Sequence, residues 1–570
     1  MNIIAIIPAR GSNKSTPYKN TKLLAGKPMI AYSIETALKC PLVDRVVVST
    51  DDIEIAAVAR KYGAQTPFMR PKELAQDETP MLPVLQHAVD WLEKNENEKI
   101  DIVVLLDATT PFRTSENIEE CIKKLQSTNA DSVITVCEAE HNPYFVMVQL
   151  DDDKMQPLLK TDDAITRRQD APKVYRINAG VYAIKKDVLM QQNKIFTDNT
   201  RVVIMPQRNS VHIDNSNDFE LAEFLAKKKA EMDETNKMKF LVIGLGSMGK
   251  RRIRNLKYLR AGEITGFDTS AEKRKEAEDK YGIKTFETLE GAINENPDAF
   301  VISTPPDSHL EFALLAAKNN KHFFTEVNVP SEDISKLVEA IKGKDIVAAP
   351  SSTLRFNSLI KKMKSILDEG SLGKPLSFTY HCGQYLPDWH PWEDYRGFYV
   401  SRKETGACRE MIVFELSWIK WMFGDIKKIS CIKDKLSSLE TQIDDVYQTI
   451  MKFDNGIMGH VLIDVVSRVP YREFKLLCEK GVIIWDWTNR VLKVFSSEKG
   501  QWEEYHEKKV TPETGYIAGE EMYIEEMKTF IDAIIKKEDY GYTFEEESKI
   551  INTLYAAEKS SDQGVHEELK

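Results

Sequence analysis

The apolar pattern of a buried parallel strand begins twice in this chain, near its start and again close to residue 240. Residues 3–7 are followed by an amphipathic stretch at 29–38 and by β-branched runs at 45–49, 101–106 and 131–136. This alternation predicts a largely parallel sheet covered by helices. After a polar stretch at 233–237, a new strand begins at Met238 and the alternation repeats to about residue 349. The chain is therefore expected to contain two α/β parts in tandem.

The texture changes after about residue 375. Longer alternating runs at 446–453, 456–465 and 474–487 are separated by Asp-Asn-Gly and Lys-Gly turns, which is typical of an antiparallel sheet. Because one core organises roughly 100 to 200 residues, a chain of 570 residues needs several domains. We predict a first domain at 1–232, a linker at 233–237, a Rossmann domain at 238–355, an antiparallel-sheet domain of the α+β class at 356–557, and a tail at 558–570.

Composition excludes several classes of protein. The 78 Lys and Arg residues against 89 Asp and Glu give a net charge of -11, which argues against a nucleic-acid partner. The seven cysteines lack CxxC spacing, so we expect neither a zinc site nor a disulfide framework, and a reducing cytoplasm fits best. No signal peptide and no bilayer-spanning apolar run is visible, so no membrane partner is expected.

The segment Ile6-Ile-Pro-Ala-Arg-Gly-Ser-Asn-Lys-Ser-Thr-Pro-Tyr-Lys-Asn20 places basic and small polar residues just after the first strand. Such a loop, at the carboxyl end of a parallel strand, can wrap a triphosphate with backbone amides and cationic side chains. On composition alone, a solvated loop with ordinary basic residues is an equal alternative.

The same segment resembles the IPARGGSKGxPxKN signature of acylneuraminate cytidylyltransferases, and the resemblance extends over residues 1–228. Further matching segments are Leu23-Leu-Ala-Gly-Lys-Pro-Met-Ile30, Ser49-Thr-Asp51, Arg70-Pro71 with Leu74-Ala-Gln-Asp77, Thr109-Thr-Pro-Phe-Arg113, Arg168-Gln-Asp170, residues 178–182, and Ile213-Asp214 with Asp218-Phe219. The resemblance implies a Rossmann-type sheet like that of nucleotide-diphospho-sugar transferases, and a homodimer formed through this domain. It also implies transfer of CMP from CTP to an acidic nine-carbon sugar of the sialic, legionaminic or pseudaminic type, with release of pyrophosphate.

The resemblance assigns roles to individual residues. It implies that Arg10, Lys14 and Lys19 hold the CTP phosphates and that Asp214 holds Mg²⁺. It places Asn20, Arg70 and Thr79 near the cytidine, and Arg168, Gln169 and Asn178 near the sugar acid. These residue types suit the reaction, because cations must neutralise charge on the displaced pyrophosphate while the two substrates are aligned.

Three positions depart from the signature. Ser12 and Ser15 replace two glycines, which is expected to change the loop geometry or the nucleotide affinity. Asp107 replaces the usual Gln near the substrates and could bind metal, change the sugar preference or weaken activity. His212 stands where many relatives have a second acidic residue, so the metal would rest on one carboxylate, waters and phosphate oxygens. Alternatively, His212 is a strand-end histidine without a ligand role.

The segment Gly244-Leu-Gly-Ser-Met-Gly249 follows the apolar strand at 240–243 and opens a helix, which is typical of dinucleotide binding. Asp268 closes the next strand and is placed to accept from a ribose 2′-hydroxyl. This favours NAD(H) over NADP, although Arg274 lies nearby. The residues expected at the cofactor are Gly244, Gly246, Ser247, Met248, Gly249, Asp268, Thr304, Pro305 and His309.

Val301-Ile-Ser-Thr-Pro-Pro-Asp-Ser-His309 and Leu354-Arg-Phe356 resemble the glucose-fructose oxidoreductase and inositol dehydrogenase (Gfo/Idh/MocA) family, over about residues 238–555. In that family a Glu-Lys-Pro motif supplies an active-site Lys, and a later segment supplies a proton-handling His and an Asp. Here the first motif reads Thr325-Glu-Val-Asn-Val-Pro330, without the Lys, and Phe414 and Ser417 replace the His and Asp. Either another group transfers the proton or no alcohol is oxidised.

Several residues could compensate for this loss. Glu410, Glu415 and Arg409 are substitutes on position, Glu326 is retained, and Arg355 is a further candidate for binding substrate. The stretch 381–396, which begins with His381, crowds polar and aromatic side chains in a way that suits a polyhydroxylated sugar. The alternative is that its aromatic residues belong to the sheet core and its charges to a solvated face.

The sequence thus predicts a CMP-nonulosonate synthetase fused to an NAD-dependent oxidoreductase-like module that acts in the same surface-glycan sugar pathway. Two alternatives stay open. The acceptor could be 3-deoxy-octulosonic acid, or the second half could be a non-catalytic regulator that binds a sugar or a nucleotide.

Overall fold

The computed structural model describes residues 1–11, 19–159, 165, 167–328, 334–389, 393–397, 399–507 and 519–569. The chain divides into two compact units, Met1–Ala230 and Glu231–Lys570. Helix α6 (Ser216–Thr235) continues across this division, so three of the five residues expected in the linker at 233–237 are helical. No helix among the described residues is long and apolar enough to cross a membrane.

The first unit is built on a six-stranded sheet in the order β10-β6-β9-β5-β1-β4. Its strands are β1 (Ile3–Pro8), β4 (Arg45–Ser49), β5 (Ile102–Leu105), β6 (Ser132–Glu138), β9 (Tyr175–Lys185) and β10 (Thr200–Ile204). Strand β9 runs antiparallel to both of its neighbours, β5 and β6, whereas the other pairings are parallel. A parallel arrangement places the carboxyl ends of β1, β4 and β5 at one edge, where ligands bind in such sheets.

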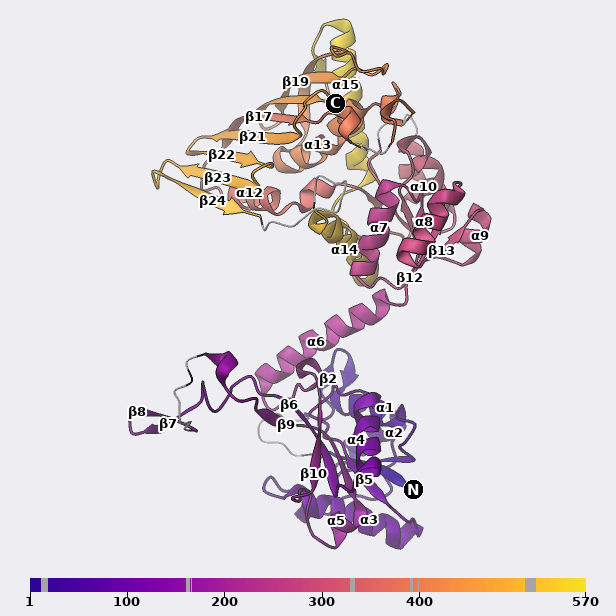
Figure 1. Ribbon diagram of the computed structural model, residues 1–570, viewed down its shortest axis with the longest axis vertical. Helices are drawn as coiled ribbons and strands as arrows, with labels where there is room; N and C mark the ends of the chain where they lie inside the picture. The colour runs from indigo at the N-terminus through magenta and orange to yellow at the C-terminus, as the bar shows by residue number, and fades with distance from the viewer. Residues whose placement is uncertain are drawn as a thin grey trace. The chain divides into compact units, whose positions relative to one another are not determined.

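Helices cover both faces of this sheet (Figure 1). One face packs against α1 (Met29–Leu38), α2 (Ile53–Lys61) and α4 (Ser115–Ser127), and the other against α3 (Met81–Glu96) and α5 (Lys186–Met190). Alternate residues of β1 enter the two cores, which explains why the strand is apolar throughout. Two hairpins complete the unit: β2 (Leu23–Leu24) with β3 (Lys27–Pro28), and β7 (Val148–Asp151) with β8 (Lys154–Pro157).

The second unit begins with a six-stranded parallel sheet in the order β13-β12-β11-β14-β15-β16. Its strands are β11 (Lys239–Ile243), β12 (Glu263–Phe267), β13 (Lys284–Phe286), β14 (Ala299–Ile302), β15 (His322–Thr325) and β16 (Ala348–Pro350). Its helices are α7 (Ser247–Tyr258), α8 (Ala271–Tyr281), α9 (Leu289–Asn294), α10 (His309–Lys318) and α11 (Ile334–Ile341). This is the doubly wound fold that the glycine-rich segment predicts.

A nine-stranded sheet follows, in the order β24-β23-β22-β21-β17-β20-β19-β18-β25. All its pairings are antiparallel except that of β17 with β20. The strands are β17 (Pro375–Gly383), β18 (Ile426–Asp434), β19 (Val446–Phe453), β20 (Met458–Asp464), β21 (Tyr471–Cys478), β22 (Gly481–Asp486), β23 (Val491–Ser496), β24 (Gln501–His506) and β25 (Glu567–Glu568). The helices are α12 (Ser358–Asp368), α13 (Ala407–Phe423), α14 (Glu521–Lys536) and α15 (Phe544–Gln563).

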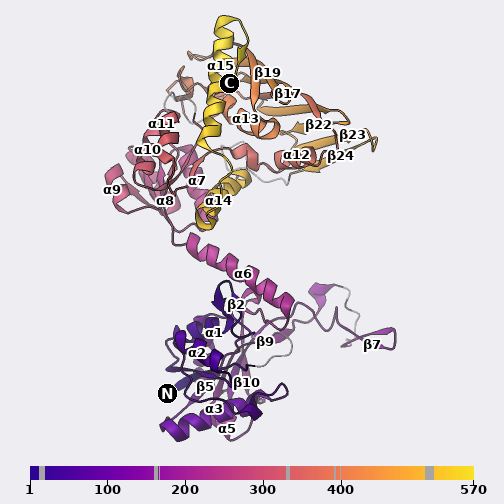
Figure 2. The same cartoon turned by 180° about the vertical axis from the view of Figure 1, so that it is seen from behind.

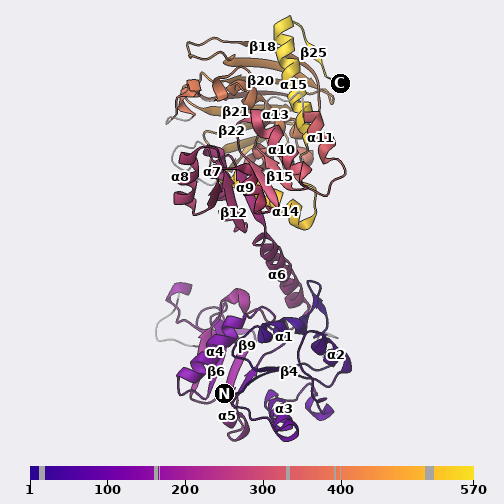
Figure 3. The same ribbon diagram turned by 90° about the vertical axis from the view of Figure 1, so that its right-hand side faces the viewer.

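Helix α15 packs against both sheets of the second unit. Helix α15 contributes Leu554 and Ala557 to the core under the nine-stranded sheet, and Phe544 and Ile551 to the core beside the parallel sheet. Figure 2 shows α15 beside the nine-stranded sheet. The residues expected as a tail, 558–570, continue this helix to Gln563 and then form β25 beside β18 (Figure 3).

The core between α13 and the nine-stranded sheet is aromatic, and Trp418 lies at its centre. Its side chain has no exposed surface. Its ring contacts Tyr380, Phe474 and Trp485 at centroid distances of 5.5, 5.3 and 5.8 Å, and its indole N–H donates to Glu415 at 2.9 Å. The single helix α13 is thereby fixed to three strands of the sheet.

Replacing Trp418 should destabilise the second unit severely. We expect Trp418→Ala to lower its free energy of unfolding by about 3–5 kcal/mol, because the change leaves a large cavity and removes a donor from a buried carboxylate. Trp502→Ala is the control, since the Trp502 side chain is 48% exposed, and it should cost less than about 1 kcal/mol. Urea unfolding followed by circular dichroism measures both, and equal losses would contradict the assignment of Trp418 to the core.

Candidate functional sites

The first candidate site lies where β1 ends. The side chain of Lys19 is only 5% exposed, and its Nζ is 4.0 Å from Oδ1 of Asp214. Burial lowers the pKa of Lys19, whereas the charges of Asp214 and Asp107 oppose this effect. The site therefore holds a buried lysine among carboxylates that come from distant parts of the chain.

Arg10 and Asn20 flank this lysine. Arg10 donates to the carbonyl of Gln76 at 3.0 Å and pairs with Asp77 at 2.9 Å, while the Asn20 amide donates to the carbonyl of Arg10 at 3.0 Å. These bonds fix both ends of the glycine-containing loop. Lys14, Ser12 and Ser15 lie outside the described residues.

Asp107 is held by the segment that follows it. Its Oδ1 accepts from the backbone N–H and the hydroxyl of Thr109, at 3.1 and 2.9 Å. Arg113, buried below, donates to the Asp107 carbonyl and to Ser33, and burial lowers the pKa of Arg113 to about 10. The Asp107 carboxylate is thus ordered and contributes negative potential near Lys19.

His212 positions Asp214. Its Nε2 is 3.1 Å from Oδ1 of Asp214, and its Nδ1 is 3.2 Å from the Thr109 hydroxyl and 3.1 Å from that of Thr110. Because an ionised carboxylate only accepts, Nε2 is the donor in its contact with Asp214. Both ring nitrogens are engaged in these contacts, which fits the reading of His212 without a ligand role.

The other residues expected at the two substrates are more dispersed. Arg70 is buried and donates to the hydroxyl and carbonyl of Ser49 at the end of β4; burial lowers its pKa to about 10. Thr79 donates to the carbonyl of Glu73. The Asn178 amide is 1% exposed and bonded to Thr135 and Ser210, so it orders the sheet interior.

Arg168 and Gln169 are exposed in a short 3-10 turn, Arg168–Asp170, that precedes β9. Arg168 donates to the carbonyl of Glu140. No contact of either side chain with Lys19 or Asp214 is present among the described residues. The structure of the single chain therefore does not bring these two residues to the lysine site.

The second candidate site is a cavity of about 950 Å³ in the second unit. Eight of the nine residues expected at the cofactor line one end of it: Gly244, Gly246, Ser247, Met248, Asp268, Thr304, Pro305 and His309. Gly249 instead permits close packing, since a Cβ there would lie 1.8 Å from the Gly244 carbonyl oxygen. A Cβ on Gly246 would meet no protein atom within 4 Å, so the loop is open toward the cavity at that point. These features fit a dinucleotide.

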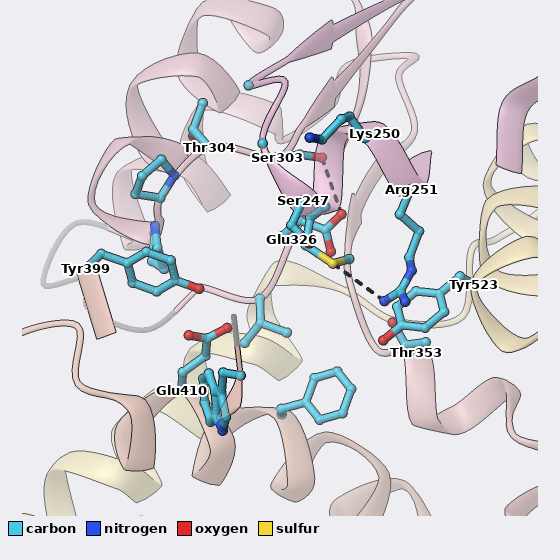
Figure 4. Close-up of a pocket in the computed structure, with 18 of the residues that line it drawn as sticks. Ser247, Lys250, Arg251, Ser303, Thr304, Glu326, Thr353, Tyr399, Glu410 and Tyr523 are labelled. Atoms are coloured by element: carbon cyan, nitrogen blue, oxygen red, sulfur yellow. Dashed lines mark hydrogen bonds between the residues drawn. The ribbon is translucent and has the colours of Figure 1, made fainter. Parts of the chain in front are cut away.

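Two carboxylates that line the cavity differ in their partners (Figure 4). Glu326 accepts from Nε and Nη2 of Arg252 at 2.6 and 2.9 Å. Glu410, on α13, accepts a hydrogen bond from Tyr399, and its Oε2 is buried without a partner among the described residues. Burial raises the pKa of Glu410 to about 7; the charge of Glu326 acts in the same direction, and the Tyr399 bond opposes both.

The remaining candidates lie outside the cavity lining. Glu415 has no exposed surface and accepts from Tyr380, Trp418 and Arg472. Arg409 pairs with Glu558, and Arg355 donates to the carbonyls of Ser417 and Gly541. His381 bonds Asp464 at 2.6 Å and the hydroxyl of Tyr471, which does line the cavity. His390 lies outside the described residues.

Three residues of this site were not found from the sequence. Arg252, Tyr399 and Arg472 carry no motif, because each acts through a partner distant in sequence. Among these three, only Arg252 had a signal in the sequence: it is one of two arginines, with Arg251, on the buried face of α7.

Comparisons with known proteins agree with this geometry. Residues 4–244 match the model of the family described as Cytidylyltransferase. The chain is 35% identical over 227 residues to the post-translational flagellin modification protein B of Campylobacter coli, and 36% identical over 227 residues to the CMP-N,N'-diacetyllegionaminic acid synthase of Campylobacter jejuni. Each alignment covers 40% of this chain and 96% of the relative. The chain belongs to the cytidylyltransferase family.

The cytidylyltransferase unit is followed by an oxidoreductase-family unit. Residues 238–350 match the model described as Oxidoreductase family, NAD-binding Rossmann fold, and residues 360–484 match the GFO/IDH/MocA C-terminal domain. Levoglucosan dehydrogenase in complex with NADH has a similar fold, with a TM-score of 0.53 and 19% identity over 58% of this chain and 99% of that one. The predicted family and fold class of both halves are confirmed.

The role of Gly246 in binding the cofactor can be tested separately from its effect on folding. Gly246→Ala should leave the melting temperature unchanged, because the added Cβ meets no protein atom. It should weaken NADH binding by about tenfold or more, since the pyrophosphate needs close approach to this backbone. Nicotinamide fluorescence measures the affinity. Gly397→Ala, also in open space, is the control, and unchanged NADH affinity in Gly246→Ala would refute the assignment.

Glu410 makes stability depend on pH. Because its pKa in the folded protein is raised to about 7, the native state retains a proton that the unfolded chain releases, and this contribution is lost as pH rises from about 5 to 8. Glu410→Gln lacks the effect, so its stability relative to wild type should increase over that interval by up to about 3 kcal/mol. Urea unfolding at both pH values tests this, with exposed Glu404→Gln as the control for one lost charge. A Glu410→Gln difference that does not vary with pH would be inconsistent with a raised pKa.

Proposed function

We propose that the first unit transfers CMP from CTP to a nonulosonic acid of the sialic, legionaminic or pseudaminic type, with release of pyrophosphate. The observation that carries the proposal is the 35–36% identity to relatives, one named as a CMP-N,N'-diacetyllegionaminic acid synthase, over 96% of their length. The buried lysine site supports it, because Lys19 is positioned to neutralise phosphate charge where the first strand ends.

The chain's own residues divide the work of this reaction. Lys19 and Arg10 bind and orient the triphosphate, and Asn20 holds the loop that carries Arg10. Asp214 is 72% exposed and aligned by His212, so its carboxylate is available to hold Mg²⁺ together with phosphate oxygens. When bound, Mg²⁺ would supply charge neutralisation at the leaving pyrophosphate. Asp107 orders the Thr109 segment, and its charge disfavours a second anion placed directly against it.

The first unit is proposed to form a homodimer. Exposed apolar side chains occur in the β7–β8 hairpin and just before it, and on strands β9 and β10 of the main sheet. They are Val146, Met147, Val148, Leu150, Met155, Tyr175, Ile177, Val202 and Ile204. Large exposed apolar patches mark interaction surfaces in proteins. A dimer would also bring Arg168 and Gln169 of one chain near a neighbouring subunit. A cytoplasmic location suits the seven free, buried cysteines.

The second unit is proposed to oxidise or reduce a polyhydroxylated sugar with NAD(H). Some polar atoms of cavity-lining residues are buried without a hydrogen-bond partner among the described residues, including Thr304 Oγ1, Trp389 Nε1 and Glu410 Oε2. Buried polar groups are normally satisfied, so a ligand rich in hydroxyl groups suits this cavity. The bound dinucleotide would supply or accept the hydride.

Asp268 supports NAD(H) rather than NADP. Its carboxylate accepts from the N–H groups of Leu245 and Ser270, both at 2.8 Å, and it lines the cavity where a ribose would lie. Arg274 donates to the carbonyls of Asp268 and Thr269. Both bonds are made by Nη1, which is therefore engaged with the backbone rather than with a 2′-phosphate.

The mass of the product after incubating the whole chain with CTP, Mg²⁺, NAD(H) and nonulosonic acids tests both reactions. A CMP adduct identifies the first reaction, and a change of two mass units identifies the second. No pyrophosphate release with any sialic, legionaminic, pseudaminic or 3-deoxy-octulosonic acid would refute the first. Binding of NADH without turnover of any sugar would favour a regulatory second unit.

Lys19→Met should reduce CMP transfer by about 100-fold or more, because a preorganised cation at the phosphates is lost. Exposed Lys22, which lies over the ring of Phe219 at 3.9 Å, provides the matched control Lys22→Met, expected to retain nearly full activity. Pyrophosphate release measures both variants. Equal activity of Lys19→Met and wild type would remove Lys19 from the site.

A further inference from the structure

Arg472, on strand β21, lines the cavity, and its orientation is fixed by a buried carboxylate. Its Nε donates at 2.9 Å to Glu415, which has no exposed surface. The other oxygen of Glu415 accepts from the Tyr380 hydroxyl at 2.6 Å and from the Trp418 indole at 2.9 Å. The Cys382 thiol also donates to Glu415, at 3.5 Å. Four donors therefore hold this carboxylate in place, and the carboxylate in turn fixes the guanidinium.

The end of the guanidinium that faces away from Glu415 is available. Arg472 lines the cavity, and its side chain is 21% exposed. Within the described ranges, neither Nη1 nor Nη2 has a hydrogen-bond partner, and neither is among the buried unsatisfied atoms. The Trp487 ring lies 5.2 Å from the guanidinium carbon and limits its rotation. Two parallel N–H donors on a fixed plane match the two oxygens of a carboxylate.

The carboxylates that line the same cavity as Arg472 are compatible with an anion bound there. Glu326 is paired with Arg252 at 2.6 Å, and burial raises the pKa of Glu410 to about 7, so that much of it is protonated near neutrality. Glu393, which also lines the cavity, is exposed. Positions 327 and 414 are occupied by Val and Phe, so they add no charge. Nη1 and Nη2 of Arg472 are thus well suited to bind a carboxylate in this cavity.

We propose that Arg472 binds the carboxylate of a sugar acid, so that the second unit takes a carboxylated sugar of the same chemical class as the acceptor of the first. This inference deepens the proposed oxidoreductase function and rests on it. The carboxylate of a nonulosonic acid is retained when CMP is attached at the anomeric oxygen, so both the free acid and its CMP ester carry the recognised group. Glu415 is a positioning residue that acts through Arg472.

The test uses the full chain loaded with NADH, whose nicotinamide fluorescence reports on the second unit. The probes are N-acetylneuraminic acid, D-glucuronic acid and the methyl ester of each. We expect both acids to change the fluorescence saturably and each ester, which lacks the charge, to bind at least tenfold more weakly. Arg472→Met should lose tenfold to a hundredfold in affinity for the acids while its affinity for NADH stays unchanged.

Two further variants keep the result interpretable. Because Arg472→Met leaves Glu415 buried without its cation, the double variant Glu415→Gln/Arg472→Met removes the pair together, and it should show the same loss of acid binding. Arg468→Met is the matched control, since exposed Arg468 lies over the Tyr385 ring at 3.7 Å and does not line the cavity. It should bind acids as wild type does.

The outcomes separate the inference from the function on which it rests. Failure of the wild-type chain to bind NADH would overturn the proposed oxidoreductase function and the inference with it. Normal NADH binding with no response to either acid would overturn the inference alone. The same holds for equal binding of acid and ester, and for acid binding that survives in the double variant. Loss of acid binding in both Arg472 variants, with the control intact, supports it.

Discussion

Arg252 holds the second unit together at the point where its functional parts meet. The side chain has no exposed surface and is shared by Glu326, after β15, and Glu526, on α14. Glu526 also accepts from Ser351, Ser352 and Thr353, which follow β16. One guanidinium therefore connects the helix behind the glycine loop, the floor of the cavity and a helix from the end of the chain. Removing it would leave two buried carboxylates unpaired, which typically costs about 3–5 kcal/mol.

A second arginine held by a buried carboxylate lies along the cavity, but its surroundings differ from those of Arg252. Arg252 is enclosed and serves the fold, whereas Arg472 is fixed by a buried carboxylate but keeps one edge toward the cavity. Glu410 is the contrasting case: a carboxyl group without a cation, whose pKa burial raises to about 7. Burial with a partner thus yields permanent charge, and burial without one yields a group that titrates near neutrality. A cavity that contains both can bind an anion and exchange a proton.

Sequence reasoning located the strands and the glycine loop, because these depend on local patterns. Lys19 and Asp214 are 195 residues apart, and only the resemblance to cytidylyltransferases assigned both to one site; the structure places Lys19 Nζ 4.0 Å from Asp214 Oδ1. Sequence reasoning could not decide which side of helix α13 faces the cavity. Glu410 and Phe414, four residues apart on α13, share the cavity face, whereas the adjacent Arg409 and Glu415 turn away from it. A motif identifies a position in the sequence, but the side chains of successive helix residues point in directions that differ by roughly 100°. Similarly, nothing local indicates that the Asn178 amide points into the sheet.

Strand β25 is only two residues long, yet it occupies the outer position of the nine-stranded sheet, paired with Lys428 and Ile429 of β18. Helix α15, which precedes β25, packs beside β18, and the hydroxyls of Ser560 and Ser561 accept from backbone N–H groups of β18. An uncovered edge strand offers its free amides and carbonyls to any passing strand. Strand β25 thus protects the edge of β18. A variant without β25 would tend to associate edge to edge through β18, although the residues that line the cavity would all be present.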